Sequence, residues 1–143
     1  MESIEREVYV EARPELVWAA LTHPERFASW YAFGGAEFEL RPGGPLVMRW
    51  DEHGEYRGFV EKVEPTRRFA YCYAVDPEVD PVPGNSNFVE FTLTPEGEGT
   101  RLHVEEGDFD RLDVPAEDRA RHVGEAAQAW DAALAALAES LRE

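Results

Sequence analysis

The C-terminal stretch constrains the fold most, because it has the apolar spacing of one long helix. Within residues 115–142, six apolar side chains follow one another at steps of four, three, four, three and four: Val123, Ala127, Trp130, Leu134, Leu137 and Leu141. This spacing places them on one stripe of a helix. Asp113 is a candidate cap, and Pro115 suits the first helical turn. Such a stripe must be buried against another element, and most of residues 35–108 have the pattern of strands, so the predicted partner is a sheet.

The residues before this helix have the alternation and the turn signals of antiparallel strands. Residues 4–11 alternate apolar and polar side chains, which predicts a first strand with one buried face. Two short helices are predicted at residues 14–21 and from residue 24 to about residue 31. Six further strands are predicted at residues 36–40, 45–51, 55–64, 67–75, 87–94 and 100–106. Because the connections are short, neighbouring strands are expected to pair antiparallel. The sum is an α+β fold in which a curved antiparallel sheet of about seven strands wraps around the long C-terminal helix.

Length and cysteine usage set the expected domain number and compartment. A chain of 143 residues suits a single domain covering residues 1–143. No apolar run approaches the length of roughly 18 to 20 residues that spans a bilayer, and no secretory signal is visible at the N-terminus. Cys72 is the one cysteine of the chain, so no internal disulfide forms. We therefore expect a cytoplasmic protein without membrane insertion.

The formal net charge of −16 argues against nucleic acid as a partner. A polyanion is repelled by such a field unless basic side chains are concentrated in one patch, and Arg67–Arg68 is the one adjacent basic pair. The acidic side chains are expected mainly to keep the protein soluble. All basic residues except Lys62 are arginine, which together with abundant Ala, Gly and Pro suggests a bacterial, GC-rich genome.

Several motifs, in order along the chain, resemble one superfamily. They are Ala12-x-Pro14-Glu15-x-Val17-Trp18, the pair Gly34-Gly35, Gly58-x-Val60-x-x-Val63-x-Pro65-x-x-Arg68-Phe69, Val89-x-Phe91-x-Leu93-x-Pro95, and the apolar stripe of the last helix. Together they resemble the START-like (SRPBCC) superfamily, and most closely its branch named after the activator of the heat-shock-90 ATPase. The resemblance implies the helix-grip fold. It does not imply one function, because the superfamily includes lipid and hormone carriers, polyketide cyclases, oxygenase subunits and co-chaperones.

The predicted concave face of the sheet provides a candidate ligand-binding cavity. Large aromatic side chains with a polar edge can hold and orient an apolar ligand. The expected lining residues are Phe38, Met48, Trp50, Tyr71, Tyr73, Phe91, Val104, Glu106, Val123, Ala127 and Trp130. Glu106 shares a face with Leu102 and Val104 by alternation, which makes it the acid expected to approach the cavity. The alternative is that the aromatic residues fill the core and Glu106 lies in water.

No motif for catalysis, metal binding or cofactor binding is found. The four histidines lack the spacing of a metal site, and His103 is expected on the solvated face beside Arg101 and Glu105. No serine lies in a GxSxG context. Neither Gly34-Gly35 nor Gly43-Gly44 matches a phosphate-binding loop. We therefore predict no catalytic residue, no metal and no cofactor.

These observations leave three functions open. The favoured one is a binding module for a small apolar or amphipathic ligand. A less favoured one is a cavity enzyme of the polyketide-cyclase or hydrolase kind, in which Glu106, Tyr71 or Tyr73 assists proton transfer. The third is a co-chaperone-like interaction domain, which would have a filled interior. Residues 76–86 are a candidate lid, and an exposed patch with Phe33 and Tyr31 would favour a homodimer.

Overall fold

The computed structural model describes residues 3–142 and contains one sheet, three α-helices and a 3₁₀ helix. The elements in chain order are β1 (Ile4–Val10), α1 (Pro14–Thr22), α2 (Pro24–Trp30), β2 (Gly35–Phe38), β3 (Pro45–Trp50), β4 (Gly54–Glu64), β5 (Arg68–Ala74), β6 (Ser86–Glu96), β7 (Gly99–Gly107), η1 (Phe109–Arg111) and α3 (Ala116–Ser140). The predicted boundaries of all helices and strands agree with these to within two residues.

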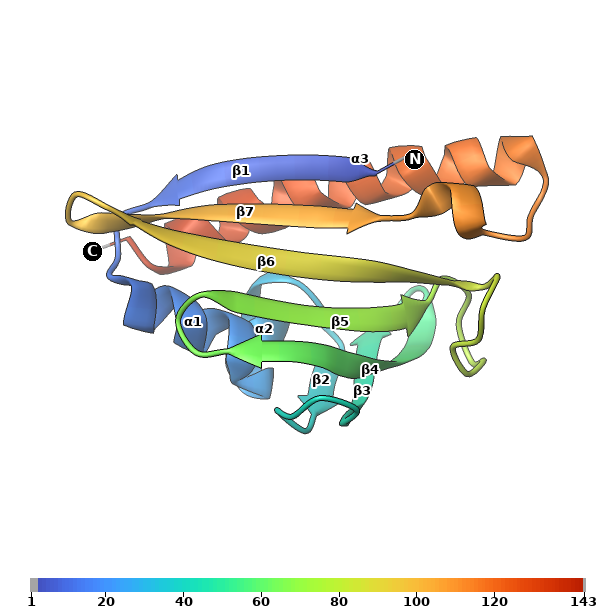
Figure 1. Ribbon diagram of the computed structural model, residues 1–143, viewed down its shortest axis with the longest axis horizontal. Coiled ribbons are helices and arrows are strands. Elements are labelled where there is room, and N and C mark those ends of the chain that lie inside the picture. The colour runs from blue at the N-terminus through green and yellow to red at the C-terminus, as the bar shows by residue number, and fades with distance from the viewer. Residues whose placement is uncertain (1–2, 143) are drawn as a thin grey trace.

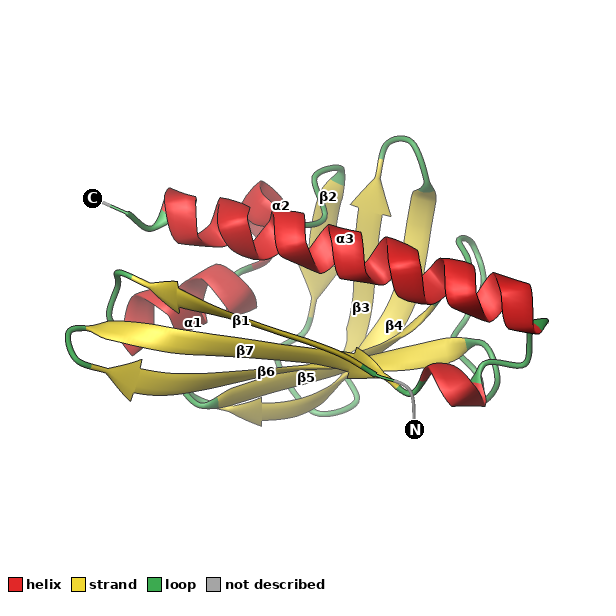
Figure 2. Cartoon of the chain, turned by 90° about the horizontal axis from the view of Figure 1, so that it is seen from above, coloured by secondary structure: helices red, strands yellow, loops and turns green. Residues whose placement is uncertain are grey.

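The seven strands form one antiparallel sheet in the order β1-β7-β6-β5-β4-β3-β2. The sheet curves around α3, and α1 and α2 cover its far end beside the C-terminal half of that helix (Figures 1 and 2). This arrangement confirms the predicted α+β helix-grip fold. None of the helices within residues 3–142 is both long enough and apolar enough to cross a membrane.

Two local features help the sheet to curve at β4. The pairing of β4 with β5 shifts register between Val60 and Lys62, and such irregularities bend a strand. Gly58 approaches β5 so closely that a Cβ atom at this position would collide with the backbone carbonyl oxygen of Cys72. The glycine is therefore required by the close contact of the two strands.

The start of α3 differs from the prediction in one detail. Pro115 occupies the position before the first turn, and no side chain caps the helix. Asp113, the predicted cap, lies two residues too early, and its backbone N–H donates to the carbonyl oxygen of Gly84 at 2.7 Å. The prediction of a side-chain cap at Asp113 is therefore wrong. Glu117 and Asp118 still supply negative charge in the first turn.

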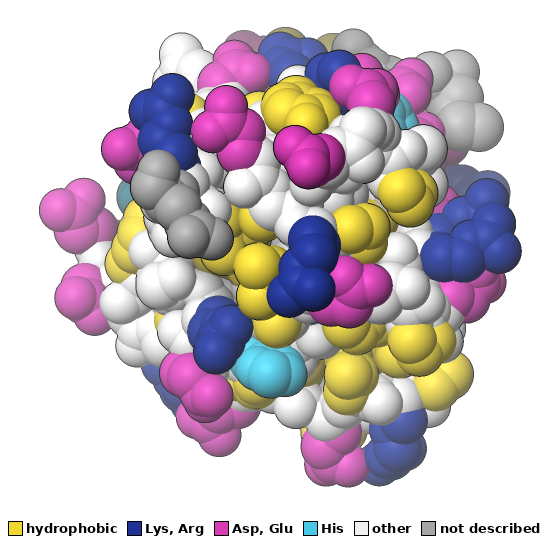
Figure 3. All heavy atoms as spheres, turned by 90° about the vertical axis from the view of Figure 1, so that its left-hand side faces the viewer, with side chains coloured by type: hydrophobic (Ala, Val, Ile, Leu, Met, Phe, Trp, Pro, Cys, Tyr) yellow, Lys and Arg dark blue, Asp and Glu magenta, His cyan; other side chains and the backbone are white. Residues whose placement is uncertain are grey.

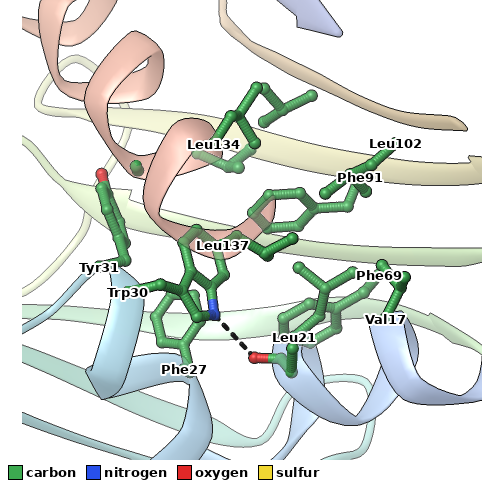
Figure 4. Close-up of a cluster of buried hydrophobic side chains, with 14 of the residues drawn as sticks. Val17, Leu21, Phe27, Trp30, Tyr31, Phe69, Phe91, Leu102, Leu134 and Leu137 are labelled. Carbon is green, nitrogen blue, oxygen red and sulfur yellow. Dashed lines mark hydrogen bonds between the residues drawn. The ribbon is translucent and has the colours of Figure 1, made fainter. Parts of the chain in front are cut away.

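The main core lies where α1, α2 and the C-terminal half of α3 meet the sheet. Side chains from all three layers interdigitate there, and Phe69 and Phe91 stack with ring centroids 6.3 Å apart (Figure 4). Trp30 is buried, and its Nε1–H donates to the carbonyl oxygen of Ala20 at 2.9 Å. At this end of the molecule the surface mixes acidic, basic and apolar side chains (Figure 3). The interior of this part of the fold is therefore filled by packed side chains.

The N-terminal half of α3 is packed less closely. Trp130, Ala133, Leu134 and Leu137 are buried, whereas the predicted stripe residues Val123 and Ala127 are half-buried against a smaller cluster of Ile4, Val75, Phe109 and Leu112. The helix α3 therefore packs against the main core with its C-terminal half and against the smaller cluster with its N-terminal half.

Candidate functional site

A cavity of about 690 Å³ lies between the sheet and the N-terminal half of α3. It is lined by Tyr31, Trp50, His53, Tyr56, Tyr73, Val75, Asp76, Pro77, Asn87, Glu106, Phe109, Arg121, His122, Glu125, Ala126, Gln128 and Ala129. Its volume lies within the range of about 300–1,000 Å³ that is usual for small-molecule sites. Asp76 and Pro77 belong to the loop considered as a lid.

Glu106, near the end of β7, is the most buried charged group of the cavity, with 1% of its surface exposed. Three neutral groups donate hydrogen bonds to it. Trp130 Nε1–H donates to Oε1 at 2.7 Å, and Asn87 Nδ2 donates to Oε2 at 3.2 Å. The hydroxyl of Tyr73 also contacts Oε2 in a short hydrogen bond. One carboxyl group thus joins β5, β6, β7 and α3.

Strand register explains why these side chains meet. Tyr73 on β5 is directly opposite Asn87 on β6, and Val89 on β6 is opposite Glu106 on β7. Asn87 and Val89 are two residues apart and therefore share a face, so Glu106 lies diagonally across from Asn87. Trp130 reaches the same point from α3.

Burial controls the acid–base properties of this group. Loss of hydration raises the pKa of Glu106 above its ordinary value, while the bonds from Tyr73, Trp130 and Asn87 and the charge of His122 oppose the rise. Burial also raises the pKa of Tyr31, Tyr71 and Tyr73 far above the ordinary tyrosine value. These three hydroxyls therefore stay protonated at neutral pH.

Aromatic rings form one side of the cavity. The ring of Trp50 meets that of Tyr31 edge-to-face at 5.0 Å between centroids, and that of Tyr56 at 5.5 Å. Tyr31 in turn stacks on Trp130 at 4.5 Å. Because these contacts hold the rings against one another, the aromatic side has a defined shape before a ligand arrives.

The residues predicted to line a cavity have different positions. Trp50, Tyr73 and Glu106 line it. Trp130 is buried behind it and reaches Glu106 through its indole nitrogen.

The other predicted lining residues do not line the cavity. Met48, Tyr71, Phe91 and Val104 are buried in the main core, and Phe38 packs against that core. Val123 and Ala127 pack against the smaller cluster. Near α1 and α2 the concave face of the sheet is covered by packed side chains. Strand alternation shows which side chains point to this face, but not whether they lie in the core or line the cavity.

Sequence reasoning missed several lining residues, among them Asn87, Tyr56, His122 and Tyr31. Asn87 could have been found, because it begins a strand whose alternation places it on the face of Val89 and Phe91. Tyr31 was expected at the surface beside Phe33, and this prediction is wrong. Tyr31 is 9% exposed, because its ring stacks on Trp130, whereas Phe33 is 65% exposed.

The histidines take different positions. His103 lies on the solvated face with Arg101 and Glu105, as predicted, with its Nε2 3.0 Å from a carboxylate oxygen of Glu5. His53 and His122 line the cavity. Within residues 3–142, no three His, Cys, Asp or Glu side chains are grouped as a metal site would require.

Comparisons with known proteins agree with this architecture. The model of the family described as "Activator of Hsp90 ATPase homolog 1-like protein" matches residues 11–142. Protein MLL2253 from Mesorhizobium loti superposes with a TM-score of 0.79 at 26% identity, over 96% of this chain and 95% of its own. CalU16 from Micromonospora echinospora gives a TM-score of 0.70 at 26% identity, over 94% of this chain and 73% of its own. The Aha1 dimer from Colwellia psychrerythraea gives 0.74 at 16% identity, over 99% and 96%. No curated protein matches the chain.

Proposed function

The chain belongs to the family of Activator of Hsp90 ATPase homolog 1-like proteins, and from this premise we propose that it binds a small amphipathic molecule in its cavity. The observation that supports this most strongly is the cavity itself, which has aromatic side chains on one side and the buried carboxyl of Glu106 among its lining groups. An apolar ligand body can contact Trp50, Tyr56 and Ala129, while a polar group reaches Glu106. This combination of an apolar surface with a few polar groups is what small-molecule sites use for affinity and orientation.

Binding of a neutral fluorescent dye, N-phenyl-1-naphthylamine, tests this proposal. We expect saturable fluorescence enhancement with the native chain. Ala129→Trp places a large side chain in the cavity and is expected to abolish the enhancement. Ala132→Trp is the matched control, because Ala132 is exposed on the same helix and does not line the cavity. Equal dye binding by both variants, or no binding by the native chain, would contradict the proposal.

A second candidate is a cavity enzyme that uses Glu106 in proton transfer. The observation that favours it is the raised pKa of a buried carboxyl group that is hydrogen-bonded to Tyr73. Such a group could act as a general acid if a bound substrate presented an acceptor to it. Turnover that is lost in Glu106→Gln while ligand binding persists would separate this function from binding alone.

The remaining alternatives concern partners and location. A co-chaperone-like domain that uses its surface would have a filled interior, so the cavity favours ligand binding over it. As part of the proposal, we place the protein in the cytoplasm, in agreement with a lone, unpaired Cys72. We also propose a homodimer, supported by the dimeric state of the Colwellia protein and by the exposed ring of Phe33.

A further inference from the structure

The hydrogen bonds around Glu106 show what kind of ligand group its surroundings suit. An indole nitrogen and an amide nitrogen can donate but cannot accept, so Trp130 and Asn87 treat Glu106 as an acceptor. The Tyr73 hydroxyl completes the set. An ionised carboxylate has about four acceptor positions, and three are used. Oε1 takes a single bond, from Trp130, and therefore has an acceptor position to spare.

A second acceptor at this point is also unused. Asn87 is 2% exposed, and its Oδ1 is buried with no hydrogen-bond partner among residues 3–142. An unpaired buried amide oxygen costs free energy unless something donates to it. Both free positions, on Glu106 and on Asn87, accept. The complementary ligand group is one that carries several N–H donors and no acceptor, which describes an ammonium group.

Glu106 also has no positive partner. All three groups bonded to it are neutral, and among residues 3–142 it takes part in none of the salt bridges, which join surface side chains such as Arg121 and Glu125. Within the described residues, His122 on α3 acts on Glu106 through its charge and forms no hydrogen bond or salt bridge with it. A buried carboxylate without a counter-ion is costly, and a cation bound beside it lowers that cost.

The aromatic side of the cavity suits a cation as well. The faces of Trp, Tyr and Phe rings carry negative electrostatic potential and attract ammonium groups within about 6 Å. Trp50, Tyr31 and Tyr56 meet at nearly right angles, with interplanar angles of 86° and 85° at the two Trp50 contacts. Since the ring of Tyr31 is stacked on Trp30 and Trp130, the rings whose faces a cation in this corner can contact are those of Trp50 and Tyr56. The formal net charge of −16 attracts cations toward the protein in general.

We propose that the ligand of this cavity is an organic cation, a primary or secondary ammonium group on an apolar body, with its N–H groups donating to Glu106 and Asn87 beside the rings of Trp50 and Tyr56. This assignment rests on the proposed ligand-binding function and adds the chemical class of the ligand. The apolar body extends along Ala126 and Ala129 toward the cavity mouth. The other charged side chains and histidines that line the cavity are Asp76, Glu125, Arg121, His53 and His122.

Three probes with one apolar body and different head groups test the assignment. They are 4-phenylbutylamine, 4-phenylbutan-1-ol and 5-phenylpentanoate, each used to displace N-phenyl-1-naphthylamine at neutral pH. We expect the amine to bind about tenfold or more tightly than the alcohol, and the carboxylate to bind most weakly. Equal or tighter binding of the alcohol or the carboxylate overturns the cation assignment and leaves the proposed function standing. If the dye binds but none of the three probes displaces it, the assignment is also overturned. Failure of the dye itself to bind contradicts both.

Two variants locate the source of the preference. Glu106→Gln keeps a polar side chain of similar size but removes the charge, and it is expected to make the amine and the alcohol bind about equally. Glu105→Gln is the matched control on the same strand, because Glu105 lies on the solvated face and does not line the cavity, so the preference should persist. Trp50→Leu keeps the carboxyl group of Glu106 and is expected to weaken binding of the amine more than binding of the alcohol. A preference that survives both Glu106→Gln and Trp50→Leu would overturn the assignment.

Discussion

The two halves of α3 lie against one sheet but against different interiors. The C-terminal half contributes Leu134 and Leu137 to the filled core, together with side chains of α1 and α2. The N-terminal half, where α1 and α2 do not reach, faces the cavity with Ala126, Gln128 and Ala129. Small and polar side chains there leave a volume that larger apolar ones would occupy. One helix thus supplies stability at one end and a site at the other.

This difference has an energetic consequence. In a filled core each methyl group is surrounded, so its removal loses both burial and contacts. Around the cavity, side chains already have a free side, and the polar cluster of Glu106, Asn87 and Tyr73 costs desolvation free energy. The cavity half is therefore expected to contribute less to folding, and its groups remain available for a ligand.

The largest expected effect comes from truncating the filled half. Leu137→Ala removes a fully buried side chain and should lower the free energy of unfolding by about 2–5 kcal/mol. Val123→Ala, on the same stripe but half-buried at the cavity end, should cost only about 1 kcal/mol. Urea denaturation of both variants measures the two values. Similar losses at both positions would mean that the two halves of the helix are packed alike.

A smaller effect is expected from the pH dependence at the cavity end. Burial raises the pKa of folded Glu106 above the unfolded value of about 4.3, so the folded state holds its proton to higher pH. Stability from this group is present below the unfolded pKa and is lost as the pH rises through the folded pKa. Glu106→Gln removes this dependence. The free energy of unfolding of the variant minus that of the native chain should therefore rise as the pH increases from the unfolded value of about 4.3 through the folded pKa of Glu106.

Differences between the two proteins at a single pH do not decide this prediction, because glutamine presents an amide to the donors of Trp130 and Asn87 and adds a constant cost. The prediction is tested by how this difference in the free energy of unfolding changes with pH. Parallel curves across the pH range would show that Glu106 ionises in the folded chain as it does in the unfolded one.

The filled half of the molecule could be predicted from the sequence more completely than the cavity half. The apolar periodicity alone predicts that Leu134 and Leu137 share one helical stripe. The alternation and the turn residues predict where the strands begin and end. Core packing follows this periodicity because burial depends mainly on which face a side chain occupies. The same alternation placed Glu106 on the inner face with Leu102 and Val104.

The rest of the site depends on contacts between elements far apart in the chain. The meeting of Tyr73 with Asn87 depends on the register of β5 and β6, which the sequence pattern does not specify to the residue. Tyr31 follows the last turn of α2, and its burial depends on stacking against Trp130 of α3. Where the cavity lies depends on where α1 and α2 stop covering the sheet. The alternation of side chains along a strand does not specify the strand register, the stacking of Tyr31 or the position of the cavity.

The most direct test is a backbone amide NMR titration of the native chain with 4-phenylbutan-1-ol, a neutral probe that requires only the cavity. We expect saturable shifts at Asn87, Glu106 and residues 121–129, with residues 134–140 of the same helix nearly unchanged. Saturable shifts confined to the C-terminal half of α3, or no saturable shifts at all, would contradict the claim that this helix closes a core at one end and a ligand site at the other.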